Sequence, residues 1–218
     1  MLARFPDWLM GKGQRWSYTR IWMHALMAAL GVTAAIWGAS ATLAVPVAQI
    51  FAENASHELV QSAALAAATL ASVIAVARGT GLPRYAALVT GVISFAGFLR
   101  ETPTCRGDVE IFCAAPDIRS SLMAVGAAVL IIATLAYARR DRAGILQAIN
   151  PRFSWPLALA GALVGASQIG EELHLVAVEE TLELYSYFVL MLGAAYLALI
   201  STRAAVLRQH GCEDKPKP

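Results

Sequence analysis

Six stretches of this 218-residue chain contain no Asp, Glu, Lys or Arg, and each is close to the length of a helix that crosses a bilayer. Such a helix needs roughly 20 mostly apolar residues to span a hydrocarbon core of ~30 Å. Only 15% of the residues are charged, against roughly 25% in soluble domains. We therefore exclude a water-soluble enzyme or a nucleic-acid-binding module, and we expect the lipid bilayer to be the main partner. The predicted fold is an all-α bundle of six membrane helices, over residues 21–45, 57–77, 84–102, 120–138, 153–171 and 182–202.

The basic residues predict how these spans are oriented. Cytoplasmic loops close to a membrane carry an excess of Lys and Arg. With the N-terminus in the cytoplasm, 14 of the 17 Lys and Arg residues lie inside, and only Arg100, Arg106 and Arg119 lie outside. The opposite orientation would reverse this ratio, so we expect both termini in the cytoplasm. The chain then consists of a cytoplasmic or interfacial N-terminal segment, a membrane domain and a cytoplasmic tail, over residues 1–20, 21–202 and 203–218.

Two of the three cysteines fall in the same predicted outer loop. Cys105 and Cys113 lie between the third and fourth spans, whereas Cys212 lies in the predicted cytoplasmic tail. An oxidising compartment permits a disulfide in the first position and not in the second. We predict a Cys105–Cys113 disulfide. Two free thiols or one metal site are the alternatives, and the eight-residue spacing without a nearby His counts against a metal.

The acidic residues gather on the side of the membrane opposite the basic ones. Of the 15 carboxylates, 11 lie on or near the predicted outer face. Counting 1.5 Å per helical residue from the basic anchors, four spans bring a carboxylate to about the same depth, at Glu58, Glu101, Glu171 and Glu183. Ionisable groups within a membrane normally face the interior of the bundle or a water-filled cavity. We therefore expect one polar site at this depth, although acidic residues at wet helix ends are the alternative.

Further polar side chains accompany these carboxylates at helical spacing and are predicted to support the site: His57, Gln61, Gln168, Glu172 and Tyr187.

The carboxylates outnumber the basic groups near them. Arg100 is the single fixed positive partner, with His57 and His174 as titratable ones. Carboxylates that are held together must retain a proton or bind a cation. A site of Glu oxygens with one or two imidazoles and no thiolate suits Ca, Mg, Mn or Fe(II). We predict a divalent metal ion, with ligands Glu58, Glu101, Glu180 and Glu183.

Three residues are candidates for chemistry beside this ion. Glu171 and His174 have the i, i+3 spacing that di-iron carboxylate bundles use, but the second copy of that motif is missing. Arg100 is expected to position a carboxylate or an anionic group of a substrate. The sequence contains no nucleotide-binding or haem-attachment motif.

Gly161 and Gly165 have the spacing at which small residues let helices in lipid approach closely. We interpret this pair as tight packing within the bundle, with dimerisation as the alternative.

Three short motifs resemble a motif set of uncharacterised bacterial multi-pass membrane proteins. They are E-x-x-x-x-E-x-x-Q at 53–61, Arg-Glu at 100–101 and E-E-x-x-E at 179–183. The resemblance implies the bacterial inner (plasma) membrane and carries no function with it. It also implies that six residues form one site, namely Glu58, Gln61, Arg100, Glu101, Glu180 and Glu183.

Three functions remain open from the sequence. The leading hypothesis is a membrane protein with an outward-facing divalent-cation site, which could support chemistry at the outer leaflet, and enzymatic activity is left undecided. The second is a proton- or cation-coupled transporter, although the inner halves of the spans contain almost no polar residues. The third is a non-catalytic subunit or assembly factor that docks a membrane-protein partner. A homo-oligomer is also open.

Overall fold

A computed structural model describes residues 20–43, 56–103, 105 and 113–210 of the chain. Residues 1–19 of the predicted N-terminal segment, Glu53 of the first motif and the second half of the predicted tail, residues 211–218, lie outside the described residues. Within them the chain forms seven helices and no strand, which confirms the all-α prediction. The helices are α2 (Ile21–Leu43), α4 (Ser56–Arg78), α5 (Gly81–Glu101), α6 (Pro116–Arg140), α7 (Arg142–Ala148), α8 (Pro151–Glu172) and α9 (Val176–His210).

Five of the described helices are long and apolar enough to cross a membrane, namely α2, α4, α5, α6 and α9. The fifth predicted span falls on α8, which has 22 residues but is not among these five. Its sequence is less apolar because Ser154, Pro156, Ser167 and Gln168 interrupt it. The chain therefore has the helices of a membrane protein, in which α8 differs from the other long helices.

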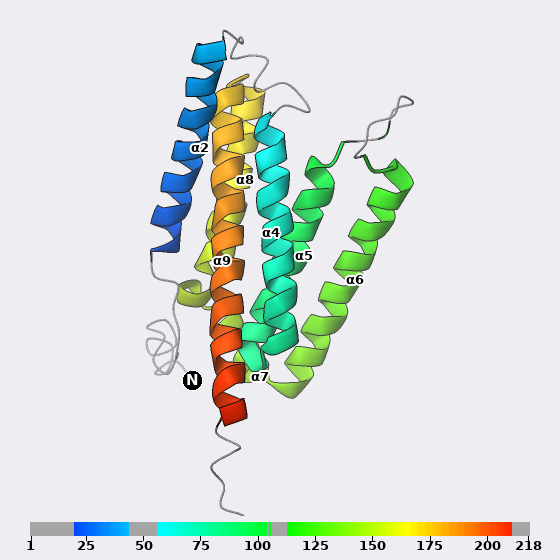
Figure 1. The fold of residues 1–218 in the computed structure, drawn as a ribbon. Coiled ribbons are helices and arrows are strands. Elements are labelled where there is room, and N and C mark those ends of the chain that lie inside the picture. Colours follow the sequence, from blue (N-terminus) through cyan, green and yellow to red (C-terminus); the bar gives the residue numbers. More distant parts are fainter. Residues whose placement is uncertain (1–19, 44–55, 104, 106–112, 211–218) are drawn as a thin grey trace, which may run out of the picture.

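The long helix α9 lies at the centre of the bundle. It packs against α2, α4, α5 and α8, and α4 also packs against α5. Figure 1 shows α6 at the edge of the bundle beside α5, and none of the residues of α6 is buried. The two ends of the bundle differ in charge. We call the end where α4 and α9 begin and α5 and α8 end the acidic end.

Small side chains bring the central helices close together. Ala64, Ala68 and Ala194 are buried in the core around Leu65 and Leu184. Where α4 crosses α5, a Cβ atom added at Gly91 would lie only 2.8 Å from Cβ of Ser72. Close backbone approach through small residues is the usual way in which helices associate in lipid, and it holds α4, α5 and α9 as one unit.

The start of α8 is determined by local sequence. The Asn150 side chain accepts a hydrogen bond from the backbone N–H of Arg152 at 2.9 Å, and Pro151 occupies the first helical position. An Asn cap followed by Pro is a favoured helix start. The cap fixes where α8 begins, and Phe153 in its first turn shares a buried cluster with Leu197 of α9.

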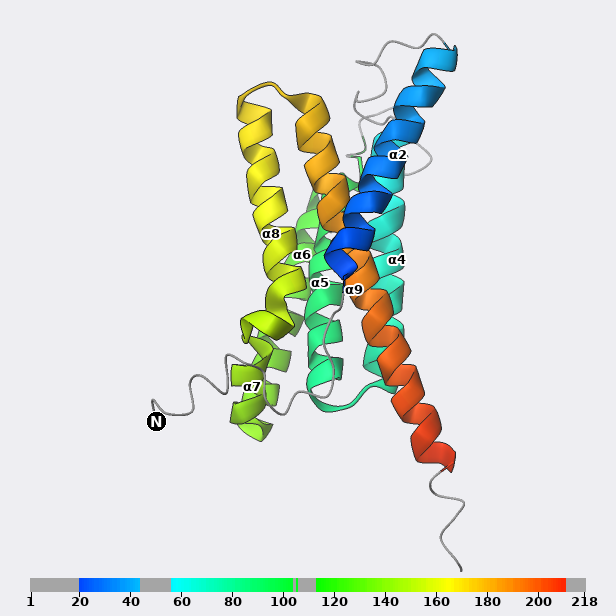
Figure 2. The same ribbon diagram turned by 90° about the vertical axis from the view of Figure 1, so that its left-hand side faces the viewer.

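A short turn joins α8 to α9 and sets their register at the acidic end (Figure 2). His174 has φ of 57°, and the backbone N–H of Leu175 donates to the Gly170 carbonyl at 2.8 Å. A residue in the left-handed conformation with a bond back to the last turn is a common helix ending. At Gly170 an added Cβ would lie 3.3 Å from the backbone nitrogen of Glu179, so the glycine lets the start of α9 lie close against α8.

Candidate functional site

Eight polar side chains from four helices meet at the acidic end of the bundle. α4 supplies two of them at i, i+4 spacing, α5 supplies its last two residues, and α8 supplies one. α9 supplies three at intervals of three and four, which places them on one helical face. We call this group the polar cluster: His57, Gln61, Arg100, Glu101, Ser167, Glu180, Glu183 and Tyr187.

Glu183 is the most enclosed carboxylate of the polar cluster, at 4% exposure. Its Oε1 atom accepts a hydrogen bond from Arg100 Nη2 at 2.7 Å and another from Ser167 Oγ at 3.1 Å. The Arg100 side chain is 40% exposed, so the ion pair lies at the edge of the buried region. These contacts connect α5 and α8 through the central helix α9.

Glu180 is held from the opposite side by α4. Gln61 Nε2 donates to Glu180 Oε2 at 2.9 Å, and Nδ1 of His57 lies 3.0 Å from the same oxygen. The side chains of His57 and Gln61 are almost completely buried, at 1% and 0% exposure. Since burying polar groups is costly unless they are hydrogen-bonded, this arrangement fixes Glu180 beside the first turns of α4.

Glu101 completes the cluster at the end of α5. Its Oε1 atom accepts a hydrogen bond from the Tyr187 hydroxyl at 2.6 Å and lies 3.7 Å from Nε of Arg100. Glu180 and Glu183 are close enough to repel its charge. Two of the carboxylates, Glu101 and Glu183, therefore lie beside the Arg100 guanidinium, whereas Glu180 is held by His57 and Gln61.

The three carboxylates share a pattern of hydrogen bonding. Each is held through one oxygen only, which is Oε1 in Glu101 and Glu183 and Oε2 in Glu180. Within the described residues, the second oxygen of each accepts no hydrogen bond. A carboxylate that is oriented through one oxygen keeps the other oxygen available for a ligand, which is how hydrogen bonds support metal-binding carboxylates.

The structure places the remaining predicted site residues outside the polar cluster. Glu58 is partly exposed in the first turn of α4. Gln168, Glu171, Glu172 and His174 are exposed at the end of α8 and in the turn that follows it. His174 lies beyond the last residue of α8, so Glu171 and His174 are not two residues of one helical face. Among the residues that the structure describes, no three His, Cys, Asp or Glu side chains are arranged to hold a metal ion.

The predicted disulfide between Cys105 and Cys113 is confirmed. The backbone N–H of Cys105 donates to the Ala114 carbonyl, and that of Ala114 donates to the Pro103 carbonyl. These contacts therefore join the described residues that follow α5 to those that precede α6. Arg119, in the first turns of α6, donates from Nη2 to the Arg100 carbonyl at 2.9 Å, which connects α6 to the end of α5.

The packing interpretation of Gly161 and Gly165 is wrong. A Cβ atom added at either position would meet no described atom within 4 Å, so no helix packs closely on this face of α8 in the described part of the chain. Ser167 is the one member of the polar cluster that the sequence did not indicate. Ser and Gln adjoin at 167 and 168, and adjacent residues point about 100° apart around a helix, so choosing between them requires the direction in which α8 faces α9.

Compared with known proteins, the chain matches no family model, no curated protein and no solved structure, so the polar cluster has to be interpreted from its own geometry.

Proposed function

We propose that this protein is a six-span membrane protein of the bacterial inner membrane, and that its polar cluster binds a divalent cation at the outer face. The sixth span in this proposal is α8. Its 22 residues correspond to about 33 Å at 1.5 Å per residue, which is enough to cross a ~30 Å hydrocarbon core. Its first and last turns carry the only charged residues of the helix, Arg152, Glu171 and Glu172.

The charges at the two ends of the bundle support the orientation. In Figure 1 the last turn of α2 lies toward the end where α9 begins, and the last turn of α9 lies at the opposite end. Basic residues gather at that end, whereas Arg100 and Arg119 lie at the acidic end. Because cytoplasmic loops carry the excess of Lys and Arg, the basic end is cytoplasmic in this proposal and the polar cluster faces outward. The basic residues at the helix ends there are Arg78, Arg84, Arg139, Arg140, Arg142, Arg152 and Arg203.

One observation carries the proposal of a cation site: each of three neighbouring carboxylates is fixed through a single oxygen. When all three are ionised, Glu101, Glu180 and Glu183 carry three negative charges, of which Arg100 offsets one and His57, beside Glu180, offsets a second only when it is protonated. Unbalanced charge in a low-dielectric region is costly. A cation bound between the second oxygens of these carboxylates would remove that cost.

The residues present fit a hard cation. Carboxylate oxygens are preferred by Ca²⁺, Mg²⁺ and Mn²⁺. Glu180 and Glu183 lie three residues apart on α9, and Glu101 contacts Tyr187 of the same helix from α5, so binding one ion requires the three carboxylates to turn toward it. Glu58, on the first turn of α4, is the fourth predicted ligand. Arg100 and Tyr187 would hold their carboxylates in place.

Elemental analysis of the detergent-purified protein tests this proposal. The wild type is compared with Glu183→Gln, which removes a charge from the polar cluster. Glu172→Gln is the matched control, because Glu172 is exposed on α8 outside the cluster. We expect close to one equivalent of a divalent metal in the wild type and the control, and a loss of metal in Glu183→Gln. A wild type without metal, or equal metal in all three proteins, contradicts the proposal.

A proton shared among these carboxylates is the second candidate for the positive charge that would balance them. The observation that favours it is the mutual proximity of Glu101, Glu180 and Glu183, because like charges in one site can be relieved by a retained proton. A protonated carboxyl group has its own infrared C=O band. In a metal-free wild type, that band should be present at neutral pH and should weaken in Glu183→Gln and not in Glu172→Gln. A proton-coupled transporter would use this carboxyl group to take up and release its proton.

A further inference from the structure

Two cavities lie side by side between α5 and α8, with α9 as their floor. The cavity next to the polar cluster has a volume of about 290 Å³, and the one nearer the basic end has a volume of about 260 Å³. Leu157 and Leu190 line both, so the two cavities adjoin, and we call them together the groove. Their combined size is within the range of roughly 300–1,000 Å³ that is typical of small-molecule sites.

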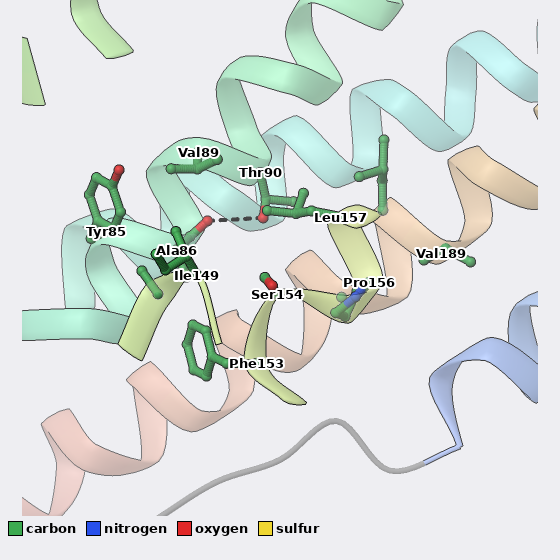
Figure 3. A pocket seen from close by; sticks show the side chains of 13 residues that line it. Tyr85, Ala86, Val89, Thr90, Ile149, Phe153, Ser154, Pro156, Leu157 and Val189 are labelled. Atoms are coloured by element: carbon green, nitrogen blue, oxygen red, sulfur yellow. Dashed lines mark hydrogen bonds between the residues drawn. The ribbon is translucent and has the colours of Figure 1, made fainter. Parts of the chain in front are cut away.

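The walls of this groove are almost entirely apolar. Figure 3 shows the part nearer the basic end, where Val89, Phe153 and Leu157 face the cavity and the Thr90 hydroxyl is turned back to the Ala86 carbonyl at 2.9 Å. In the part next to the polar cluster, Ser186 Oγ donates to the Ala160 carbonyl at 3.0 Å. The hydroxyl groups that line the groove are therefore engaged by the protein.

The groove follows the helix axes over much of the membrane. Tyr85 and Arg100 line its two ends on α5, and their separation of 15 positions corresponds to about 22 Å at 1.5 Å per residue. One leaflet of the hydrocarbon core is about 15 Å thick, half of ~30 Å. A chain-like apolar molecule that enters from one leaflet could therefore lie along the groove.

Among the residues that the structure describes, Arg100 is the only charged one in the lining of the two cavities. Its Nη2 atom donates to Glu183, whereas its Nη1 atom donates no hydrogen bond within the described residues, and 40% of the side chain is exposed. A guanidinium carries five N–H donors in a planar fork, and this geometry matches the oxygens of a phosphate. The groove thus combines a long apolar wall with one cationic donor at its end.

We propose that this groove is a phospholipid-binding site, which holds one acyl chain between α5 and α8 while Arg100 binds the phosphate group. The charge at the end of the groove matches a phosphodiester and does not match an uncharged hydrocarbon. The site uses the same guanidinium as the polar cluster, and it rests on the proposed function in one respect, because a cation bound among the carboxylates offsets the negative charge that the phosphate would otherwise meet. Variants of the groove wall test it separately from the cation site.

Gly161 offers a direct way to fill the groove. It lines the cavity next to the polar cluster, and an added Cβ would meet no described atom within 4 Å, so Gly161→Leu adds a large apolar side chain at the cavity wall without a clash at its Cβ. Gly165→Leu is the matched control. Gly165 lies one turn further along α8, has the same open surroundings and does not line either cavity.

Native mass spectrometry of delipidated protein in detergent measures the binding. Phosphatidylglycerol is the probe, and diacylglycerol, which has the same chains without phosphate, is the comparison ligand. We expect one phosphatidylglycerol per chain, an apparent affinity at least tenfold weaker in Gly161→Leu, and a change of less than twofold in Gly165→Leu. Diacylglycerol should bind at least tenfold more weakly than phosphatidylglycerol. If Gly161→Leu does not fold, Ile93→Trp fills the same cavity from α5 and should have the same effect.

Three results would overturn the proposal. The first is equal phospholipid binding in the wild type and in the variants that fill the groove. The second is diacylglycerol binding as tight as that of phosphatidylglycerol, because Arg100 would then contribute nothing. The third is a dimer that both Gly161→Leu and Gly165→Leu dissociate, because that face of α8 would then be covered by a second copy of the chain.

Discussion

Arg100 Nη2 lies 2.7 Å from Glu183 Oε1, and this contact joins the end of α5 to the middle of the acidic face of α9. The two partners differ in environment, because the Glu183 side chain is 5% exposed and the Arg100 side chain is 40% exposed. The buried Glu183 carboxylate is therefore paired with a guanidinium that is itself partly exposed at the surface of the bundle. This relationship underlies both the proposed cation site and the proposed phospholipid site.

Replacing Arg100 by Gln should destabilise the protein by leaving Glu183 buried without its charged partner. Removing one partner of a fully buried pair costs about 3–5 kcal/mol, and because Arg100 is partly exposed we expect roughly 2–3 kcal/mol. Glu183→Gln in the same background should recover part of this loss. Denaturant unfolding in detergent of the wild type, both single variants and the double variant gives the coupling energy, for which we expect ~1–3 kcal/mol. Strictly additive effects would show that the contact contributes no stability.

Tyr187→Phe should weaken the polar cluster without changing its charge. The variant removes the hydroxyl that donates to Glu101 at 2.6 Å while keeping the ring, which is 3% exposed. Hydrogen bonds to charged groups contribute about 1.5–3 kcal/mol, and we expect a loss of unfolding free energy in that range. Tyr185→Phe is the control, because the Tyr185 hydroxyl makes no hydrogen bond in the described part of the chain. Equal losses in the two variants would contradict the assigned role of Tyr187.

The disulfide provides a test of orientation. A reducing agent that does not cross membranes should open the Cys105–Cys113 bond in cells whose outer membrane is permeabilised. A membrane-impermeant maleimide should then label these two thiols in a Cys212→Ser variant. It should not label Cys212 in a Cys105→Ser/Cys113→Ser variant until the inner membrane is opened. Labelling of Cys212 while that membrane is intact would place the tail outside and reverse the proposed topology.

The sequence alone predicted the helices better than the site. Charge-free runs locate membrane helices because every backbone group in lipid must be bonded within its own helix, and a cysteine pair in an outer loop indicates a disulfide. The His57 to Gln61 and Glu180 to Glu183 intervals also predict shared helical faces. Which helical faces meet depends on tertiary packing. No local sequence pattern predicts that α9 lies at the centre of the bundle.

Two misplacements have physical causes. The spacing of Glu171 and His174 predicts that they share one helical face. The helix ends at Glu172, however, and His174 adopts a left-handed conformation that is uncommon for a residue other than glycine. Gly161 reads as a packing residue because small residues usually mediate helix contacts in lipid. In the structure it lines a cavity instead, and sequence spacing cannot distinguish these two uses of a glycine.

The thermal unfolding of the metal-stripped protein, measured as Mn²⁺ is added back, tests the central claim most directly. A ligand that binds only the folded state at 100 times its Kd stabilises that state by about 2.7 kcal/mol. The account predicts that Mn²⁺ raises the Tm of the wild type and of Glu172→Gln in a saturable way, and leaves the Tm of Glu183→Gln unchanged. An unchanged Tm in the wild type, or the same increase in Glu183→Gln, would contradict a cation site in the polar cluster.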